Sequence, residues 1–377
     1  MTNARYDAIV VGAGIVGAAC ADALARDGRR VLVVEAQFPG GGTTAAGMGH
    51  LVVMDDSPEQ MALTSYSLRL WRAMTPELPA AAELEWCGTV WVAADDEQME
   101  AVHAKRHAYA EWGIAAEALD AAALAEAEPH LRPGLAGGLL VPSDGVLYQL
   151  GATRFLLERA RAHGATVRRG CAVDAIVPNG VRCGPGGDTV HADVVVNAAG
   201  ARAAELTPGL PIVPRKGHLV ITDRYPGMVR HQLVELGYLK SAHTMTTESV
   251  AFNVQPRQTG QMLVGSSREL VGWDGSINRR VLRAMLERAC WFIPALTETS
   301  AIRTLTGFRP ATPDKLPLIG PWSPVPGLWI AAGHEGLGIT TASGTAQLLA
   351  DLVAGRAPAI DAAPFTPQRA ADAAVAH

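Results

Sequence analysis

Short apolar runs alternate with a longer helical pattern at the start of the chain. Residues 8–11 form a continuous apolar run that ends at a glycine, and residues 31–34 form a second run that ends at Glu35. Such runs are typical of parallel strands that are buried on both faces. Between them, residues 15–27 are mostly small and apolar, and Gly28 follows as a candidate helix cap. The pattern predicts one complete strand–helix–strand unit.

The same pattern returns in the middle and near the end of the chain. Residues 193–200 form an apolar run that ends in small residues. Residues 328–332 predict a strand, followed by a glycine loop and a helix from about 343 to 354. From about 212 to 267, short β-rich segments alternate with polar turns, which favours an antiparallel sheet. Those segments are 219–222, 250–254 and 262–265; other strands are expected at 88–92, 137–148 and 167–176, and helices at 58–74, 95–128, 155–163 and 279–291.

These patterns predict a mixed fold with both α/β and α+β parts. We expect a discontinuous Rossmann-like nucleotide domain with an inserted antiparallel-sheet substrate domain. The nucleotide domain is assigned residues 1–85, 140–210 and 305–377, and the substrate domain residues 86–139 and 211–304. Residues 358–377 are expected to form a loose tail.

Composition narrows the class of protein. The chain has 377 residues, of which 49% are hydrophobic and 18% charged, as in a globular protein with a large core. The net charge of −5 gives no indication of a basic face for nucleic acid. No apolar stretch of about 20 residues is present, so no transmembrane segment is expected, while peripheral attachment to the inner membrane stays open.

Five scattered cysteines indicate a reducing compartment, and we expect a cytoplasmic protein. No C-x-x-C pair and no spacing typical of metal or iron–sulfur ligands is present, so no metal site is expected. No Ser/His/Asp set with a recognisable spacing indicates a hydrolase.

The first chemical motif is the GAGIVG segment at residues 12–17. Gly12 permits a tight turn, Gly14 lets the backbone approach a pyrophosphate, and Gly17 lets helix and strand pack closely. The N-terminus of the following helix offers unpaired N–H groups to phosphates. Glu35 ends the next strand, where a carboxylate accepts hydrogen bonds from ribose hydroxyls. The alternative, a turn without a ligand, is weakened by this complete context.

Two further glycine-rich segments favour FAD over NAD. Residues 39–49 follow Glu35 and add backbone N–H groups. Residues 331–340 form a second strand-to-helix junction, whose helix N-terminus would stabilise negative charge on a reduced flavin. An ordinary glycine-rich turn is the alternative here.

Arg309 lies in the second chemical motif, GFRPATPDKLPLIG. Pro310 restricts Arg309 to an extended conformation. The planar guanidinium fork suits a carboxylate, so Arg309 is a candidate anchor for an amino-acid carboxylate. The alternative is a surface arginine paired with Asp314.

Taken together and in this order, GAGIVG with Glu35, TTAAGMG, GFRPATPDKLPLIG and AGHEGLGIT resemble the D-amino-acid oxidase-like flavoprotein superfamily. Glycine oxidase, sarcosine oxidase and D-amino-acid dehydrogenase belong to it, and the resemblance covers nearly the whole chain. It implies non-covalent FAD, since no cysteine lies in residues 331–340. The cofactor contacts that it implies are Gly12, Gly14, Ile15, Val16, Gly17, Glu35, Ala36, Thr43, Thr44, Ala45, Gly47, Met48, Gly49, Val173, Ala199, Gly200, Arg309, Gly333, His334, Glu335, Gly336, Leu337, Gly338, Ile339 and Thr340.

A narrower resemblance concerns residues 45–51 and 215–220. They look like the flavin subunit of bacterial hetero-oligomeric dehydrogenases, such as the β subunit of D-hydroxyproline dehydrogenase. This resemblance implies partner subunits, and because the chain lacks iron–sulfur ligands, a partner would have to carry such a cluster. A second flavin, FMN, at a subunit interface stays open.

The resemblance also implies that Arg309 binds the substrate carboxylate, and the positions of other side chains along the chain make them further candidates. Arg309, His50 and His218 are the catalytic candidates, although a structural role is an equal alternative for each histidine. Substrate contacts are expected from Arg309, Met48, His50, Tyr238, Phe252 and His334, and His243 is a further candidate; ordinary packing is the alternative for the aromatic residues.

The expected reaction oxidises the C–N bond of an amino acid, in the manner of a dehydrogenase acting on a D-hydroxyproline-like or D-proline-like substrate or on another D- or N-substituted amino acid. Arg309 holds the carboxylate, the amine is neutral, and hydride leaves for flavin N5 to give an imine. Three alternatives stay open: an oxidase that uses O₂, a non-catalytic flavin electron-relay subunit, and an NAD-dependent dehydrogenase.

Overall fold

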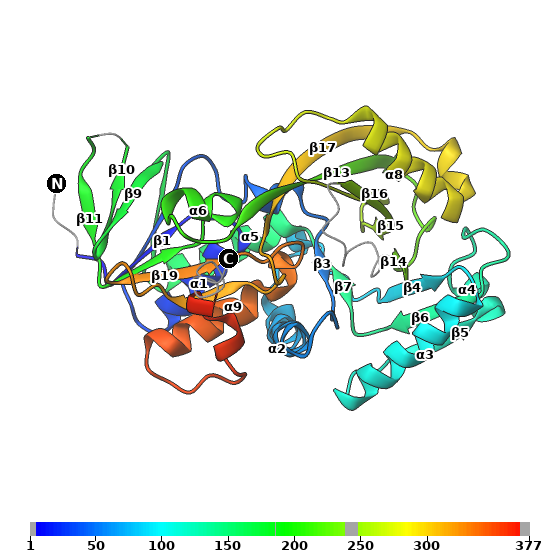
Figure 1. The fold of residues 1–377 in the computed structure, drawn as a ribbon, viewed down its shortest axis with the longest axis horizontal. Helices are drawn as coiled ribbons and strands as arrows, with labels where there is room; N and C mark the ends of the chain where they lie inside the picture. The colour runs from blue at the N-terminus through cyan, green and yellow to red at the C-terminus, as the bar shows by residue number, and fades with distance from the viewer. Residues whose placement is uncertain (1–4, 185, 238–247, 370–377) are drawn as a thin grey trace.

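The computed structural model describes residues 5–184, 186–237 and 248–369. Two large sheets lie side by side in it (Figure 1). The first has six strands in the order β18-β19-β12-β1-β2-β8, all parallel except β18. Their bounds are Ala8–Val11 (β1), Val31–Glu35 (β2), Thr166–Arg169 (β8), Val194–Asn197 (β12), Leu318–Pro321 (β18) and Leu328–Ala332 (β19).

Both faces of the six-stranded sheet are covered. Val10 packs in the cluster that includes the helices, and its neighbour Ile9 packs in the cluster on the opposite face. Burial on both faces explains the continuous apolar runs of these strands. The helices on the first face are α1 (Ile15–Arg26), α5 (Gln149–Ala162) and α9 (Gly338–Val353), with α2 (Pro58–Met74) packed on α9. The other face carries β9 (Val173–Val177), β10 (Gly180–Cys183), β11 (Thr189–His191) and α6 (Ala203–Leu206).

The second sheet has eight strands in the order β17-β13-β16-β15-β14-β4-β6-β5, antiparallel except where β14 meets β4. Their bounds are Thr89–Ala93 (β4), Glu117–Asp120 (β5), Gly137–Val141 (β6), Val213–Arg224 (β13), Gln232–Glu235 (β14), Glu248–Pro256 (β15), Gln261–Glu269 (β16) and Ala301–Ala311 (β17). Helix α8 (Arg279–Phe292) packs on β15 and β16. The two-sheet architecture confirms the predicted fold class.

The remaining elements are short or peripheral. They are α3 (Asp96–Glu111), α4 (Ala121–Ala127), the strand pair β3 (His50–Leu51) and β7 (Gly145–Val146), and the 3-10 helices η1 (Thr43–Ala46), η2 (Thr75–Glu77), η3 (Ala80–Ala82), η4 (Gly200–Arg202), η5 (Pro294–Glu298) and η6 (Ala363–Phe365).

Several predicted elements are wrong in detail. The helix expected at 95–128 is two helices separated by β5: Gly113, at φ 68°, follows the end of α3, and Asp120 caps α4 by accepting the Ala123 N–H. Alanine-rich composition hides this break because alanine favours helix, so the helical pattern extends over the strand. The strand expected at 167–176 is divided at Gly170, so β8 and β9 belong to different sheets.

Two helices begin earlier than the sequence predicts, and the expected loose tail is wrong where the structure describes it. Helix α5 starts at Gln149 and α9 at Gly338. Within residues 358–369, Phe365 is fully buried and Arg369 forms an ion pair with Asp314 at 2.8 Å. Aromatic burial and this ion pair hold the segment against the nucleotide domain.

The predicted domain boundaries at 139/140 and 304/305 cut two strands. They fall inside β6 and β17, and both strands lie wholly in the eight-stranded sheet. The residues of β17, Arg309 included, therefore pair with β13 of that sheet, not with the nucleotide sheet.

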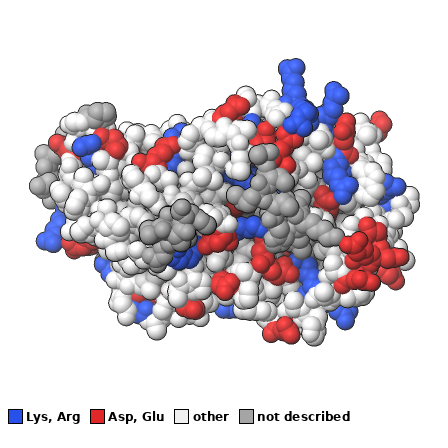
Figure 2. All heavy atoms as spheres, in the orientation of Figure 1, with Lys and Arg blue, Asp and Glu red and all other residues white. Residues whose placement is uncertain are grey.

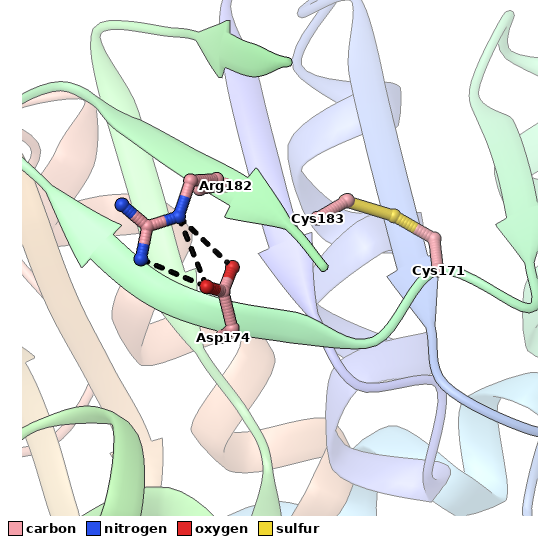
Figure 3. The surroundings of a disulfide bond; sticks show 4 residues. All are labelled: Cys171, Asp174, Arg182 and Cys183. Carbon is pink, nitrogen blue, oxygen red and sulfur yellow. Dashed lines mark hydrogen bonds and ion pairs between the residues drawn. A yellow bond between two sulfur atoms is a disulfide. The ribbon is translucent and has the colours of Figure 1, made fainter. Parts of the chain in front are cut away.

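A disulfide joins Cys171 to Cys183, whose Cα atoms are 5.5 Å apart (Figure 3). The register of the β9–β10 hairpin brings the two cysteines together across 12 positions, beside the Asp174–Arg182 ion pair at 2.8 Å. The cysteine pattern, interpreted as scattered thiols, missed this covalent link, because spacing alone does not give hairpin register.

Charged side chains of both signs are interspersed on the face in Figure 2, with acidic residues gathered toward the end where α4 and β5 lie. Within the described ranges, no helix combines the length and the apolar character that crossing a membrane requires.

Candidate functional site

The glycine turn after β1 is built by close backbone approaches. Gly12 has φ 97°, and a Cβ there would lie 2.7 Å from the carbonyl oxygen of Ala198. A Cβ on Gly17 would lie 2.0 Å from the carbonyl oxygen of Gly12. Only glycine fits at either place. The turn therefore delivers the N-terminus of α1 to the carboxyl edge of the sheet; its N-cap residue, Gly14, has no side chain, and the Ile15 N–H donates to the Thr44 hydroxyl at 3.1 Å.

Glu35 closes the other side of this turn. One carboxylate oxygen accepts the Ala13 N–H at 2.8 Å, and the other accepts the Gln37 N–H at 2.9 Å. Each oxygen keeps lone-pair capacity for a further donor. Held this way, the carboxylate is oriented to accept hydrogen bonds from the hydroxyl groups of a ribose.

A cavity of about 570 Å³ runs from this turn to the eight-stranded sheet. Most of the predicted contacts line it: Gly12, Gly14, Ile15, Val16, Glu35, Ala36, Thr43, Thr44, Gly47, Met48, Gly49, His50, Val173, Ala199, Gly200, His218, Arg309, His334, Glu335, Gly336, Gly338 and Ile339. The N-terminus of α1, the oriented carboxylate of Glu35 and the close-packed glycines of the turn fit a dinucleotide such as FAD.

Five predicted cofactor residues do not line this cavity. Gly17 and Gly333 shape turns behind it, and the hydroxyl of Thr340 donates to the His50 carbonyl oxygen at 2.9 Å. Leu337 lines a neighbouring cavity, and Ala45 lies within η1. These residues support the walls of the cavity.

Sequence reasoning missed other lining residues. Some adjoin predicted positions or lie within predicted motifs, so the sequence already pointed to them: Val11, Val34, Gln37, Gly42, Ala46, Ala172, Ala198, Gly217, Leu219, Asn253, Gly307, Pro310 and Ala331. Others come from distant segments without a local signal: Cys171, Arg202, Glu205, Leu206 and Ser266.

Arg309 presents its guanidinium to the cavity across β13. Its Nη1 donates to the carbonyl oxygen of Ser267 at 2.9 Å, and it occupies the space where a side chain on Gly217 would lie, since a Cβ there would be 2.3 Å from Nη1. Asp314 pairs with Arg369 instead, which excludes the alternative of a surface Arg309–Asp314 pair. The geometry leaves the remaining donors of Arg309 for an anion in the cavity.

His50 stands where the large cavity meets a smaller one. Its ring lines both, and its Nε2 is buried without a hydrogen-bond partner. Burial and the charge of Arg309 lower the pKa of His50 to about 4. The imidazole is therefore neutral at pH 7, and its free nitrogen is suited to a hydrogen bond with a bound molecule.

His218 is engaged within the protein. Its Nδ1 lies 2.9 Å from the Ser267 hydroxyl, and its Nε2 accepts the Asn278 N–H at 3.0 Å. Glu269 lies 3.4 Å from Nδ1. Neither nitrogen is left for substrate, so this geometry contradicts a direct proton-transfer role and favours positioning of β13.

Of the other predicted substrate residues, some line the cavity and some do not. Met48 lines the cavity. Phe252 does not: it is fully buried and stacks on Phe292 with ring centroids 4.3 Å apart, because its side chain points to the α8 face of the sheet. Tyr238 and His243 lie outside the described residues.

His334 is buried, and its Nε2 lies 2.9 Å from the Thr345 hydroxyl. Burial lowers the pKa of His334 to about 3 from an ordinary value of 6.5. The unfolded chain therefore binds a proton below pH 6.5 that the folded chain does not. The stability associated with neutral His334 is complete above pH 6.5 and is lost as pH falls toward 3.

We expect the free energy of unfolding of wild type to fall by up to about 1.4 kcal/mol per pH unit from this ring alone, and His334→Gln to lack that contribution. Urea unfolding of both proteins at several pH values between 7.5 and 4.5 measures the difference. Parallel pH profiles would contradict the assignment.

Comparison with known proteins adds independent findings. A family model described as "DAO: FAD dependent oxidoreductase" matches residues 7–352. The hydrogen cyanide synthase subunit HcnC of Pseudomonas aeruginosa is 29% identical, covering 97% of each chain. The D-amino acid dehydrogenase of Xanthobacter autotrophicus is 32% identical, covering 83% of this chain and 74% of that protein. The structure of glycine oxidase from Geobacillus kaustophilus superposes with a TM-score of 0.87 at 27% identity, covering 97% of this chain and 99% of that one.

Proposed function

This chain belongs to the DAO family of FAD-dependent oxidoreductases, and from that premise we propose that it oxidises the C–N bond of an amino acid. The observation that carries the proposal is Arg309, whose guanidinium enters the cofactor cavity from β17 with donors left for a carboxylate. The names of the relatives, a D-amino acid dehydrogenase and a glycine oxidase, support this substrate class.

The residues of the chain act mainly by positioning. Arg309 binds the substrate carboxylate, which fixes the Cα–H relative to the cavity. FAD, when bound, would supply the acceptor for one hydride, which carries both electrons, and the substrate would leave as an imine. The amine reacts in its neutral form, and neutral His50 adds no positive charge that would oppose electron loss from it.

The N-terminus of α9 supplies electrostatic stabilisation for the reaction. Gly336, Gly338 and Ile339 line the cavity, and α9 begins at Gly338 without a side-chain cap. Its unpaired N–H groups and positive dipole end stabilise negative charge that develops in the cavity.

For the substrate we propose a D- or N-substituted amino acid, with D-hydroxyproline and D-proline as first candidates. The purified yellow protein is mixed anaerobically with 4-hydroxy-D-proline, D-proline, sarcosine, glycine and other D-amino acids. We expect at least one of them to bleach the flavin absorbance. Failure of all would favour an electron-relay subunit, and a colourless protein that releases no flavin on denaturation would favour a nicotinamide enzyme.

For the electron acceptor we propose a partner subunit that carries an iron–sulfur cluster, in the cytoplasm or peripheral to the inner membrane. The resemblance of HcnC, itself named as a subunit, supports a multi-subunit enzyme. An oxidase is the second candidate, supported by the glycine oxidase likeness. Rates of peroxide release and of artificial dye reduction by the same reduced protein distinguish the two acceptors. FMN release on denaturing a co-purified complex would reveal a second flavin.

A further inference from the structure

A second cavity of about 80 Å³ adjoins the cofactor cavity. The two share His50, Asn253, Glu335 and Gly336 as lining residues. The second cavity therefore opens from the substrate side of the site. Its volume suits about two water molecules or one carboxylate group.

The lining of this cavity carries more positive than negative charge. It contains Arg215, Arg268 and Lys315 against Asp56 and Glu335. His50 adds no charge at pH 7, because its pKa is lowered to about 4. One further anion would bring the lining to neutrality.

Arg215 supplies the donors. Its side chain is only 4% exposed, and its Nη1 lies 3.3 Å from the Glu335 carboxylate. Its Nε and Nη2 are buried without a hydrogen-bond partner. Burial, opposed in part by Glu335, lowers the pKa of Arg215, and the charges of Arg268 and Arg309 lower it further. A buried charged group with unmet donors is costly unless something binds there.

Glu335 does not neutralise the positive charge of Arg215 fully, because its single negative charge is shared among several arginines. Burial would raise the pKa of Glu335, but Arg268, Arg309 and Arg215 outweigh burial and hold the pKa below its ordinary value. Water would meet the donors of Arg215 but would leave the excess of positive charge. A second carboxylate would meet both needs.

The sheet register places this cavity next to the carboxylate anchor. Arg215 on β13 is directly opposite Arg309 on β17. Opposite residues of antiparallel strands project from the same face, with Cβ atoms roughly 4.5–5.5 Å apart. One small molecule with two carboxylates a few bonds apart can therefore reach both guanidinium groups.

We propose that the second cavity is a subsite for a second carboxylate, so that among D- or N-substituted amino acids one that bears two carboxylates is preferred over neutral candidates such as D-proline. The α-carboxylate binds Arg309, and the distal carboxylate binds Arg215 with Lys315 and Arg268 around it. This inference rests on the proposed function, because it treats the bound diacid as a substrate. Binding of a diacid at the subsite can be measured without turnover.

Binding to the oxidised holoenzyme tests the subsite directly. Malonate, succinate and glutarate are each compared with the half-amide of the same length, such as succinamate, by their perturbation of the flavin absorption spectrum. We expect a diacid of matching length to bind about tenfold or more tightly than its half-amide, since one charge-assisted hydrogen bond contributes about 1.5–3 kcal/mol. Equal affinity in wild type for all three pairs would overturn the proposal.

Variants of Arg215 test whether this residue causes the preference for a diacid. Arg215→Gln is expected to abolish the diacid preference, and Arg215→Lys to weaken it while retaining charge. Arg224→Gln, an exposed position on the same strand, is the matched control and should keep the wild-type ratio. A diacid preference that persists in folded, flavin-containing Arg215→Gln would also overturn the proposal. If that variant does not fold, the wild-type ratio and Arg215→Lys still decide it.

Turnover separates this inference from the proposed function. D-aspartate is compared with D-asparagine, and iminodiacetate with sarcosine, in anaerobic flavin reduction. Reduction by neutral amino acids with no advantage for the diacids rejects the subsite and keeps the proposed function. A diacid binding preference that depends on Arg215, without reduction by any amino acid, rejects the proposed function and keeps the subsite.

Discussion

Replacing Arg309 with methionine is expected to weaken amino-acid binding, measured in flavin reduction, by roughly 30-fold to several thousand-fold. Truncating one partner of a buried charge pair costs about 2–5 kcal/mol. Arg309 donates to the Ser267 carbonyl oxygen, and its guanidinium occupies the space left by the missing side chain of Gly217. The guanidinium is therefore already oriented toward the cavity. Arg309→Lys keeps the charge but loses the paired geometry, and an intermediate loss is expected.

The measurement is the substrate concentration that gives half-maximal flavin reduction in anaerobic stopped flow. Flavin content and thermal midpoint should stay near wild type, since the guanidinium lines a cavity. Arg303→Met, an exposed position on the same strand, is the matched control and should reduce normally. An unchanged half-saturation in Arg309→Met would show that the carboxylate binds elsewhere.

Replacing Gly17 with alanine is expected to produce a protein largely without flavin. The new Cβ would lie 2.0 Å from the Gly12 carbonyl oxygen, so the turn that delivers the N-terminus of α1 must move. Overpacking of this kind costs about 1–3 kcal/mol or more, which corresponds to roughly a fivefold to 150-fold loss of cofactor affinity where the cost falls on the FAD-bound state.

The readout is the ratio of flavin to protein absorbance, followed by titration of FAD into the apoprotein. Gly275→Ala is the matched control, because its Cβ would meet atoms no closer than 3.8 Å and its backbone does not require a positive φ. A fully yellow Gly17→Ala protein with unchanged FAD affinity would refute the packing argument.

The cofactor half of the site is largely readable from the sequence. The turn, its three glycines and Glu35 lie within one strand–helix–strand unit, where backbone geometry is set by neighbours along the chain. A local motif of this kind specifies both the element and the residue types that it needs. The family match over residues 7–352 confirms the FAD-dependent family to which these motifs pointed.

The substrate half was readable only in part. Arg309 was visible because Pro310 and the surrounding motif mark it, but its strand was divided between two domains. Phe252 was placed at the site although its side chain faces α8, since a shift of one position reverses the face of a strand. Arg215 lies in a segment singled out only for a family resemblance, and the sequence did not indicate its role, because that role depends on the strand that lies opposite it.

The sequence by itself determined most of the element types, the glycine turn for FAD and the candidate for one carboxylate anchor, because these follow from local periodicity and from motif chemistry. Tertiary structure alone decided that Arg215 stands beside Arg309, that His218 is bonded on both sides and that Cys171 meets Cys183. Each of these contacts depends on the pairing register between segments that are distant along the chain. The free energy of that pairing comes from burial of a whole sheet face, so no single sequence position indicates the register.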